Sequence, residues 1–370
     1  MSDAKKTPMY EIHKASGAKI VEFAGFLMPV TYGSIIEEHR AVRERVGIFD
    51  VSHMGEFVVT GPRALEFVNE IITNDCSKLS RGAVQYSVMC RENGTAVDDL
   101  LVFAIEEDRV ILVVNASNID KDFSHVLSFP RDGVKVENAS DSYALLAVQG
   151  PMSREVLKAC PIFRGAERQI DETPYYKGFG FRRDGHEILV SRTGYTGELG
   201  FEVFAPTELG ANFWKAIVDA GRPFGIQPIG LGARDTLRFE ASYCLYGHEI
   251  DDETSPLEAG LGWVVKLAKN SFRGAGALRK EKESGSKRTL VGLELEGRNI
   301  ARPGYGVVMS GAEVGKVTSG AFSPTLEKSL CMALVARTAK DENARYSVAV
   351  RDKQIPARMT QLPFYKSRAK

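Results

Sequence analysis

The chain has 370 residues, 44% of them hydrophobic, and its 48 basic side chains balance 48 acidic ones, so its formal net charge is zero. A chain of this length can bury a sizeable core and is long enough for two or three domains. Zero net charge gives no general attraction to nucleic acid or to an anionic membrane, and we predict that neither is a partner.

The sequence also carries no export or disulfide signal. No run approaches the roughly 18 apolar residues of a membrane span, and the segment from Met1 to Pro8 lacks a signal-peptide pattern. The five cysteines are scattered and include no CxxC pair; they are Cys76, Cys90, Cys160, Cys244 and Cys331. This usage favours a reducing compartment and a core-filling role over a disulfide framework or a zinc site.

An internal duplication is indicated by two similar stretches. A strand over 56–60, a Gly-Pro turn and a helix over 63–72 are echoed by a strand over 143–148, a second Gly-Pro turn and a helix over 154–160. Proline suits the first position of a helix, so each turn is expected to start one.

Each stretch continues with a hairpin, a further strand and a helix. Strands over 86–91 and 96–103 flank Asn93-Gly94, and strands over 176–183 and 187–192 flank Asp184-Gly185; further strands are expected over 110–114 and 200–204, and helices over 117–127 and 208–220. Offsets of 89 to 91 residues recur between the matching features. The pattern predicts two related α+β units whose sheets face one another across a shared cavity.

The first hairpin places a candidate acid or base. With a two-residue loop, the predicted pairs are Glu92 with Thr95, Val88 with Asp99, and Tyr86 with Leu101. Asp99 and Tyr86 then share one face of the sheet, whereas Asp98 points to the other. An aspartate within an apolar strand is partly desolvated, which raises its pKa and suits proton transfer. The alternative is a pair of structural aspartates that bind loop backbone.

A glycine-rich segment, SRTGYTGELGFEVF over 191–204, interrupts what would otherwise be a long strand. Glycine is needed where φ is positive or where another group approaches the backbone closely, so the segment is interpreted as a binding edge. Glu202 lies in a period-two run and is expected to point into a partly buried space. A glycine-rich turn followed by one structural carboxylate would produce the same pattern.

A third cluster lies over 228–247, where two glycines open a helix that carries Arg234 in its first turn. From there the guanidinium can reach a ligand oxygen, Asp99 or Glu202, and bidentate pairing with carboxylates is favoured by arginine. An ordinary ion pair with a neighbouring acidic residue is the alternative. The histidines His53 and His248 are interpreted as structural or rim residues.

Signatures of other chemistries are absent from the sequence. It contains no GxxxxGK[ST] phosphate loop, no GxGxxG after a first strand and no HExxH motif. We therefore expect neither a nucleotide cofactor nor a metal.

Several motifs in one order resemble the T-protein family of the glycine cleavage system, the aminomethyltransferases. They are FDVSHMGE over 49–56, QYS over 85–87, DDL over 98–100, RTGYTGE over 192–198, GLGARD over 230–235, SPLEAGLGW over 255–263, GAFSPT over 320–325 and the closing PFY over 363–365. The resemblance extends nearly from end to end.

The resemblance implies an α+β fold in which three domains form a cloverleaf around a central folate channel. The expected first folate-binding α+β domain comprises residues 1–50 with 140–245, and the second α+β domain comprises residues 51–139 with 246–278. Residues 279–370 are expected to form a C-terminal β-barrel, or jelly-roll-like, domain. The inferred duplication corresponds to the first two.

The resemblance also implies a reaction. An aminomethyl group carried on the lipoyl arm of the H-protein passes to the co-substrate tetrahydrofolate, which releases ammonia and yields 5,10-methylenetetrahydrofolate. By motif, Asp99 resembles the catalytic carboxylate; the residues expected to bind substrate or folate are Tyr86, Asn115, Tyr175, Tyr195, Glu202, Arg234 and Tyr365. A carboxylate such as Glu202 can accept the adjacent N–H donors of a pterin in pairs.

The implied partners are the lipoylated H-protein and the P- and L-proteins of the same system. The implied location is the bacterial cytoplasm, or a mitochondrial matrix after processing. Two other classes remain open: a folate-dependent demethylase and a noncatalytic folate-binding protein of the same fold. For an acidic H-protein, Arg298 and Arg302 near the channel mouth are expected to aid docking. The alternative is that both are solvated loop charges and that the docking surface lies elsewhere.

Overall fold

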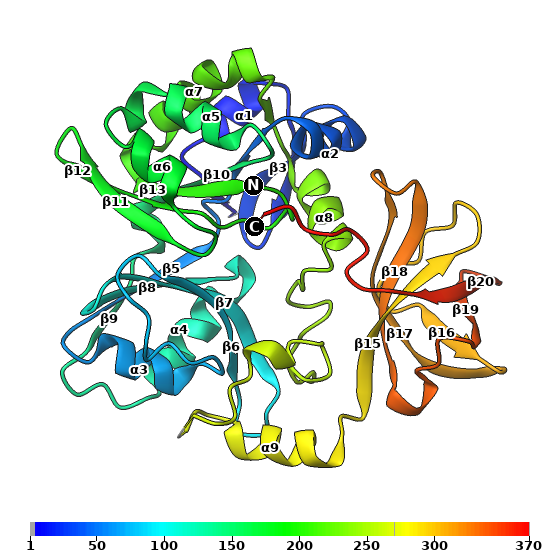
Figure 1. The fold of residues 1–370 in the computed structure, drawn as a ribbon. Coiled ribbons are helices and arrows are strands. Elements are labelled where there is room, and N and C mark those ends of the chain that lie inside the picture. The colour runs from blue at the N-terminus through cyan, green and yellow to red at the C-terminus, as the bar shows by residue number, and fades with distance from the viewer. Residues whose placement is uncertain (1–3, 270, 370) are drawn as a thin grey trace.

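The computed structural model describes residues 4–269 and 271–369, so the first three residues of the segment from Met1 to Pro8 lie outside the described residues. Figure 1 shows two α+β bodies and a β-barrel as three lobes of the molecule. This mixed α+β architecture with a C-terminal barrel confirms the predicted fold class.

A six-stranded sheet forms one α+β body. Its strands, in spatial order, are β11 (Gly178–Arg183), β12 (His186–Ser191), β13 (Gly200–Pro206), β10 (Tyr143–Gln149), β4 (Gly47–Asp50) and β14 (Gln227–Pro228). Three helices, α5 (Ser153–Ala159), α6 (Glu167–Glu172) and α7 (Gly210–Gly221), pack against one face. Phe201, Val203 and Ala205 of β13 join this helix-covered core, because alternate residues of a strand share a face. Glu202 consequently points to the opposite face.

A five-stranded sheet forms the other α+β body. Its order is β6 (Val84–Cys90), β7 (Ala96–Glu106), β8 (Arg109–Val114), β5 (Gly55–Thr60) and β9 (Lys135–Asn138), and it is covered by α3 (Ala64–Ile71) and α4 (Ile119–Leu127). In both sheets a hairpin leads to a third strand, which pairs with the first strand of the unit. This repeated order confirms the predicted duplication.

Two glycines mark the equivalent turns of the duplicated units. Gly61 and Gly150 follow the first strand of each unit and have φ angles of 127° and 126°. At each position a Cβ atom would meet backbone closely: the carbonyl oxygen of Gly133 at 2.1 Å from Gly61, and that of Arg45 at 2.5 Å from Gly150. Only glycine fits such a conformation and such an approach.

The sheets meet through their uncovered faces. One hydrophobic cluster contains residues of both, including Phe103 of β7 and Phe204 of β13, whose rings lie 6.1 Å apart. The two sheets face one another as predicted. Packed core side chains fill part of the space between them, and a cavity occupies the rest.

The two hairpin turns differ from one another. Asp184 and Gly185 both have positive φ angles and form the predicted two-residue turn between β11 and β12. In the other hairpin, Arg91 pairs with Thr95 around a three-residue loop, so the predicted pair of Glu92 with Thr95 is wrong.

A compensating irregularity follows that loop. The register shifts between Met89 and Cys90, where Val97 on β7 is left as an extra residue. This bulge cancels the longer loop, and Val88 pairs with Asp99 as predicted. The side-chain faces of Asp98 and Asp99 were therefore predicted correctly despite the wrong loop.

The remaining elements connect these bodies. A small sheet has the order β1 (Lys5–Lys6), β3 (Phe26–Thr31) and β2 (Lys19–Phe23), accompanied by α1 (Tyr10–Ala15). Helix α2 (Ile35–Glu44) packs on α8 (Leu231–Glu240), and α9 (Ala275–Ser284) precedes the barrel (Figure 1). The closed barrel has the order β15 (Arg288–Leu295), β18 (Lys328–Ala336), β17 (Ala312–Ser323), β16 (Gly306–Met309), β19 (Arg345–Val350) and β20 (Lys353–Thr360).

All five cysteines are buried and carry free thiols, as expected for core side chains. Within residues 4–269 and 271–369, none of the helices combines the length and the apolar character needed to cross a bilayer.

Candidate active site

A cavity of about 1320 Å³ lies where the two sheets, helix α8 and the barrel meet. It exceeds the roughly 300–1,000 Å³ of ordinary small-molecule sites, and it is lined by both sheets, by α8 and its following loop, and by barrel and C-terminal residues. Seven predicted site residues line it: Tyr86, Asp99, Asn115, Tyr175, Tyr195, Glu202 and Arg234. The structure thus brings together side chains that lie far apart in the sequence.

Asp99 is held on the cavity wall by two neighbours. The hydroxyl of Tyr86 donates to Oδ2 of Asp99 at 2.8 Å, and Nδ2 of Asn115 donates to Oδ1 at 2.8 Å. Burial, followed by the nearby charge of Asp98, raises the pKa of Asp99 to about 7, although its hydrogen bonds oppose the shift. A carboxyl with this pKa can accept and return a proton near neutral pH.

Glu202 faces the cavity from the six-stranded sheet. It is 9% exposed, and its Oε2 accepts a hydrogen bond from the hydroxyl of Thr193. Burial raises the pKa of Glu202, while Thr193 and the positive charge of Arg234 oppose the rise. No other donor binds this carboxylate within the described residues, so acceptor capacity remains for a ligand.

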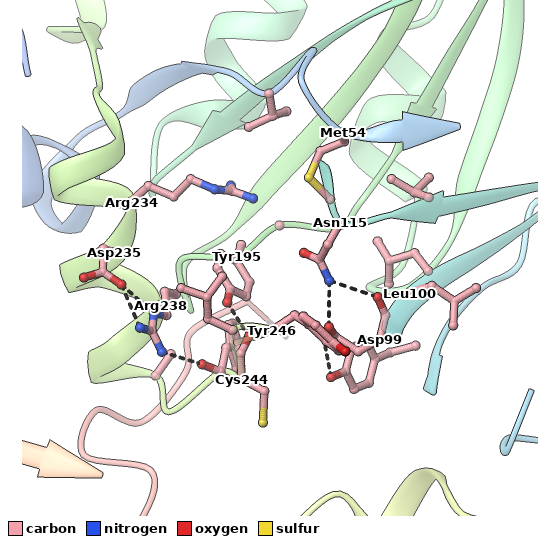
Figure 2. Close-up of a pocket in the computed structure, with 18 of the residues that line it drawn as sticks. Met54, Asp99, Leu100, Asn115, Tyr195, Arg234, Asp235, Arg238, Cys244 and Tyr246 are labelled. Carbon is pink, nitrogen blue, oxygen red and sulfur yellow. Dashed lines mark hydrogen bonds and ion pairs between the residues drawn. The ribbon is translucent and has the colours of Figure 1, made fainter. Parts of the chain in front are cut away.

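Arg234 extends into the cavity from the first turn of α8 (Figure 2). Its guanidinium lies 4.8 Å from the ring centroid of Tyr195 and forms no hydrogen bond or ion pair with the residues that the structure describes. The next arginine on the helix, Arg238, instead pairs with Asp235 and Glu249. Arg234 is therefore the guanidinium available to a ligand, and the predicted alternative of a surface ion pair is not seen.

The tyrosines form much of the remaining wall. Tyr195 donates to the carbonyl oxygen of Cys244 and stacks on Tyr243 with ring centroids 5.8 Å apart. Tyr175 meets Tyr176 edge to face at 4.6 Å. Burial raises the pKa of both Tyr175 and Tyr195, which keeps their hydroxyls protonated.

The glycine-rich segment is shaped by a buried amide. A Cβ atom on Gly194 or on Gly200 would lie within 2.0–2.3 Å of the Gln149 side chain. That side chain donates from Nε2 to the carbonyl of Thr193 at 3.1 Å and accepts at Oε1 from Thr196 at 3.0 Å. These glycines therefore admit Gln149, and the segment reaches the cavity through Gly194 and Tyr195.

One expected site residue lies elsewhere. Tyr365 does not line the cavity; its hydroxyl donates to Glu198 at 2.7 Å and its ring lies 4.0 Å from the guanidinium carbon of Arg43. The neighbouring Pro363 and Ser367 do line the cavity. In this structure Tyr365 packs against a buried ion pair between Arg43 and Glu198, and its expected contact with a ligand stays a prediction.

A histidine interpreted from the sequence as structural or rim, and a tryptophan outside the predicted site, also line the cavity. His53 is 2% exposed, contacts the edge of Phe23, and has a pKa lowered to about 4, mainly by burial. Trp263 is 60% exposed and stacks on Tyr86 with centroids 5.7 Å apart. Both lie in quoted motifs, FDVSHMGE and SPLEAGLGW, so the motifs carried a signal for them.

No group of three or more histidine, cysteine, aspartate or glutamate side chains has metal-binding geometry among residues 4–269 and 271–369. The cavity instead combines a carboxyl of near-neutral pKa with a free guanidinium and an acceptor carboxylate. This combination is typical of the active site of an enzyme that acts on a small organic substrate.

Comparison with known proteins gives the family. Residues 9–269 match the GCVT N-terminal domain, and residues 288–366 match the glycine cleavage T-protein C-terminal barrel domain. The chain is 48% identical over 360 residues to an aminomethyltransferase of Halothermothrix orenii, covering 97% of this chain and 99% of the relative. It is 49% identical over 363 residues to an aminomethyltransferase of Thermotoga neapolitana, covering 98% of each.

A solved structure agrees. The glycine cleavage system aminomethyltransferase T of Bartonella henselae superposes with a TM-score of 0.89 at 33% identity, covering 98% of this chain and 99% of that one. The chain belongs to the glycine cleavage T-protein family. It is a transferase of the aminomethyltransferase type and a component of the glycine cleavage system.

Proposed function

We propose that this enzyme transfers the aminomethyl group of a lipoylated H-protein to tetrahydrofolate, and that it releases ammonia and forms 5,10-methylenetetrahydrofolate. The observation that carries the proposal is that the buried carboxyl of Asp99, held by Tyr86 and Asn115, shares a cavity of about 1320 Å³ with Glu202 and Arg234. The volume leaves room for a folate and for a second group that delivers the carbon.

The unpaired groups of the cavity fit a folate. A pterin presents adjacent N–H donors that the Glu202 carboxylate can accept, and Arg234 can donate to a folate oxygen. Tyr195 and Tyr175 supply aromatic surface for the flat ring. In this proposal Glu202 and Arg234 bind, whereas Asp99 takes part in proton transfer.

The proton balance requires a group like Asp99. During transfer, two folate nitrogens lose protons and gain bonds to the methylene carbon, while that carbon loses its bonds to sulfur and to the amine nitrogen. One proton is returned to the sulfur and one to the departing ammonia. We assign to Asp99 the acceptance of a proton as a new carbon–nitrogen bond forms, because its pKa allows both uptake and return.

Partners and location follow from the same proposal. The H-protein supplies the carbon, and the P- and L-proteins complete the cycle. The source of the similar relatives supports a bacterial cytoplasmic enzyme. Arg298 and Arg302 lie between β15 and β16 and do not line the cavity; their proposed part in docking thus concerns the outer surface of the barrel.

A turnover assay tests the proposal. Purified enzyme, tetrahydrofolate and aminomethylated H-protein should yield methylenetetrahydrofolate and ammonia in equal amounts. Folate binding without product would instead favour a noncatalytic folate-binding protein. Formation of methylenetetrahydrofolate from an N-methylated amine, but not from H-protein, would favour a demethylase.

A further inference from the structure

A buried histidine in the cavity wall has no role in the proposed function. His53 lies in the short segment between β4 and β5, where the chain passes from the six-stranded sheet to the five-stranded sheet. It is 2% exposed, and it lines the cavity. A polar side chain buried at a cavity is a candidate for ligand binding when its own hydrogen bonds are not already made.

Hydrogen bonds to neighbouring strands fix the backbone beside this histidine. The carboxylate of Asp50, the last residue of β4, accepts from the backbone N–H of Ser52 at 3.0 Å, which closes a turn directly before His53. The hydroxyl of Ser52 in turn accepts from the backbone N–H of Leu145 on β10 at 2.9 Å. Strands β4 and β10 therefore hold His53 at the cavity wall independently of what its ring binds.

The imidazole of His53 has no hydrogen-bond partner of its own. Neither ring nitrogen bonds to any residue that the structure describes, and Nδ1 is fully enclosed. The ring instead packs edge to face against Phe23 of the β2–β3 hairpin, with centroids 5.6 Å apart. A buried polar group without a partner costs free energy, and a ligand that bonds to it returns that cost on binding.

The charge state of His53 suits a mixed hydrogen-bonding role. Burial, followed by the positive charge of Arg234, lowers the pKa of His53 to about 4, so the ring is neutral at physiological pH. A neutral imidazole offers one donor and one acceptor, whereas Arg234 only donates and the Glu202 carboxylate only accepts. The three side chains complement a ligand edge that carries both donors and acceptors, as the heterocycle of a pterin does.

A second histidine of the cavity wall is bonded differently. His248 also lines the cavity, but its Nδ1 lies 3.0 Å from the carbonyl oxygen of Thr318 and 3.2 Å from the hydroxyl oxygen of Ser319. Thr318 is the extra residue at a bulge of β17, where strand pairing is interrupted. His248 thus has bonds that tie the loop after α8 to the barrel, whereas His53 has none.

We propose that His53 is a binding residue of the cavity, whose imidazole hydrogen-bonds to the heterocyclic edge of the folate co-substrate beside Arg234. The identity of the ligand rests on the proposed function. Because the bond forms only with ligand present, it contributes to affinity and not to the stability of the unliganded protein.

A pair of substitutions separates these two contributions. His53→Phe keeps a flat ring against Phe23 but removes both nitrogens; we expect affinity for folinic acid to fall by roughly three- to tenfold, the usual contribution of one neutral hydrogen bond. The urea midpoint of the unliganded variant should be unchanged or raised. His248→Phe is the matched control: it should lower the urea midpoint and leave the affinity for folinic acid unchanged. Calorimetry and urea titrations measure both properties.

Two further measurements distinguish a direct bond from a change in the shape of the wall. In enzyme labelled with ¹⁵N at histidine, saturation with folinic acid should shift a ring-nitrogen resonance of His53, assigned with His53→Phe or, if that variant does not fold, with His53→Asn. In steady-state assays, His53→Phe should raise KM for tetrahydrofolate by the factor seen in the affinity, with little change in kcat.

The outcomes separate the two proposals. Unchanged affinity in His53→Phe, a His53 resonance that does not move at saturation, or equal losses of affinity in His53→Phe and His248→Phe would each overturn the inference. The expected pattern of binding, together with absence of aminomethyl transfer by the parent enzyme, overturns the proposed function alone. If the parent enzyme does not bind folinic acid, both are wrong.

Discussion

The two α+β units share a backbone plan but differ in the carboxylates they present. Val58 of β5 and Ala147 of β10 occupy equivalent positions, each three residues before the turn glycine that follows its strand. Val58 pairs with Ile111 in one sheet, and Ala147 pairs with Glu202 in the other. Ile111 belongs to the hydrophobic cluster between the sheets, whereas Glu202 lines the cavity. The proposed recognition group thus has an apolar counterpart.

The proposed catalytic group shows the reverse asymmetry. The same strand pairings make Leu101 of β7 equivalent to Leu189 of β12. Asp99 and Glu187 are therefore equivalent positions, because each lies two residues before one of these leucines. Asp99 is buried on the cavity wall, but Glu187 is exposed and pairs with Arg109 across the two units. Backbone pairing preserves positions in a duplicated sheet, whereas burial of each position decides what a carboxylate there can do.

Removing the charge of Asp99 should have the largest effect. Asp99→Asn is nearly isosteric, so the fold and most of the folate affinity should persist while turnover falls by ~10²–10⁴-fold, the usual contribution of a general acid or base. Steady-state rates with H-protein and tetrahydrofolate measure this. Near-normal turnover by a folded Asp99→Asn variant would remove Asp99 from the mechanism.

The same substitution should stabilise the protein, with a pH dependence set by the raised pKa. The pKa of Asp99 is about 7 in the folded protein and about 3.9 when unfolded, so folding favours its protonated form and stability falls as pH rises from about 4 to 7. Asp99→Asn removes this cost. Its gain in the free energy of unfolding should be largest above pH 7, up to about 4 kcal/mol, and should vanish below about pH 4. Urea titrations across this range measure the gain, and a constant gain at every pH would contradict the assignment.

A smaller loss is expected at the recognition carboxylate. Glu202→Ala leaves paired ligand donors without an acceptor and should weaken folate binding by about 1.5–3 kcal/mol, with little change in the free energy of unfolding. Calorimetry with folinic acid measures the affinity. Unchanged affinity would mean that Glu202 is a structural carboxylate, as one interpretation of the sequence allowed.

The counterpart of Asp99 supplies the matched control and the smallest effect. Glu187→Ala breaks an ion pair whose side chains are 29% and 41% exposed, so it should cost less than about 1 kcal/mol of stability. Folate affinity and turnover should not change. A large loss of turnover would show that the two units are more alike in function than their burial implies.

The sequence by itself determined the features that depend on neighbouring residues. The Gly-Pro turns, the Asp184-Gly185 hairpin and the period-two alternation placed the duplicated strands correctly, because turn chemistry and side-chain alternation are local. The face of Asp99 also followed, although the loop did not: a third loop residue and the bulge at Val97 cancel, and neither has a distinct local signal.

Only the tertiary structure decided contacts between distant segments. Gln149 occupies the space that Gly194 leaves open, although the binding-edge interpretation of that glycine favoured a ligand there. Tyr365 binds Glu198 instead of lining the cavity. Asn115 joins Asp98 to Asp99 through bonds that no spacing in the chain indicates. Such contacts, and the near-neutral pKa of Asp99, depend on which surfaces exclude water once three bodies pack together, and local sequence does not encode that exclusion.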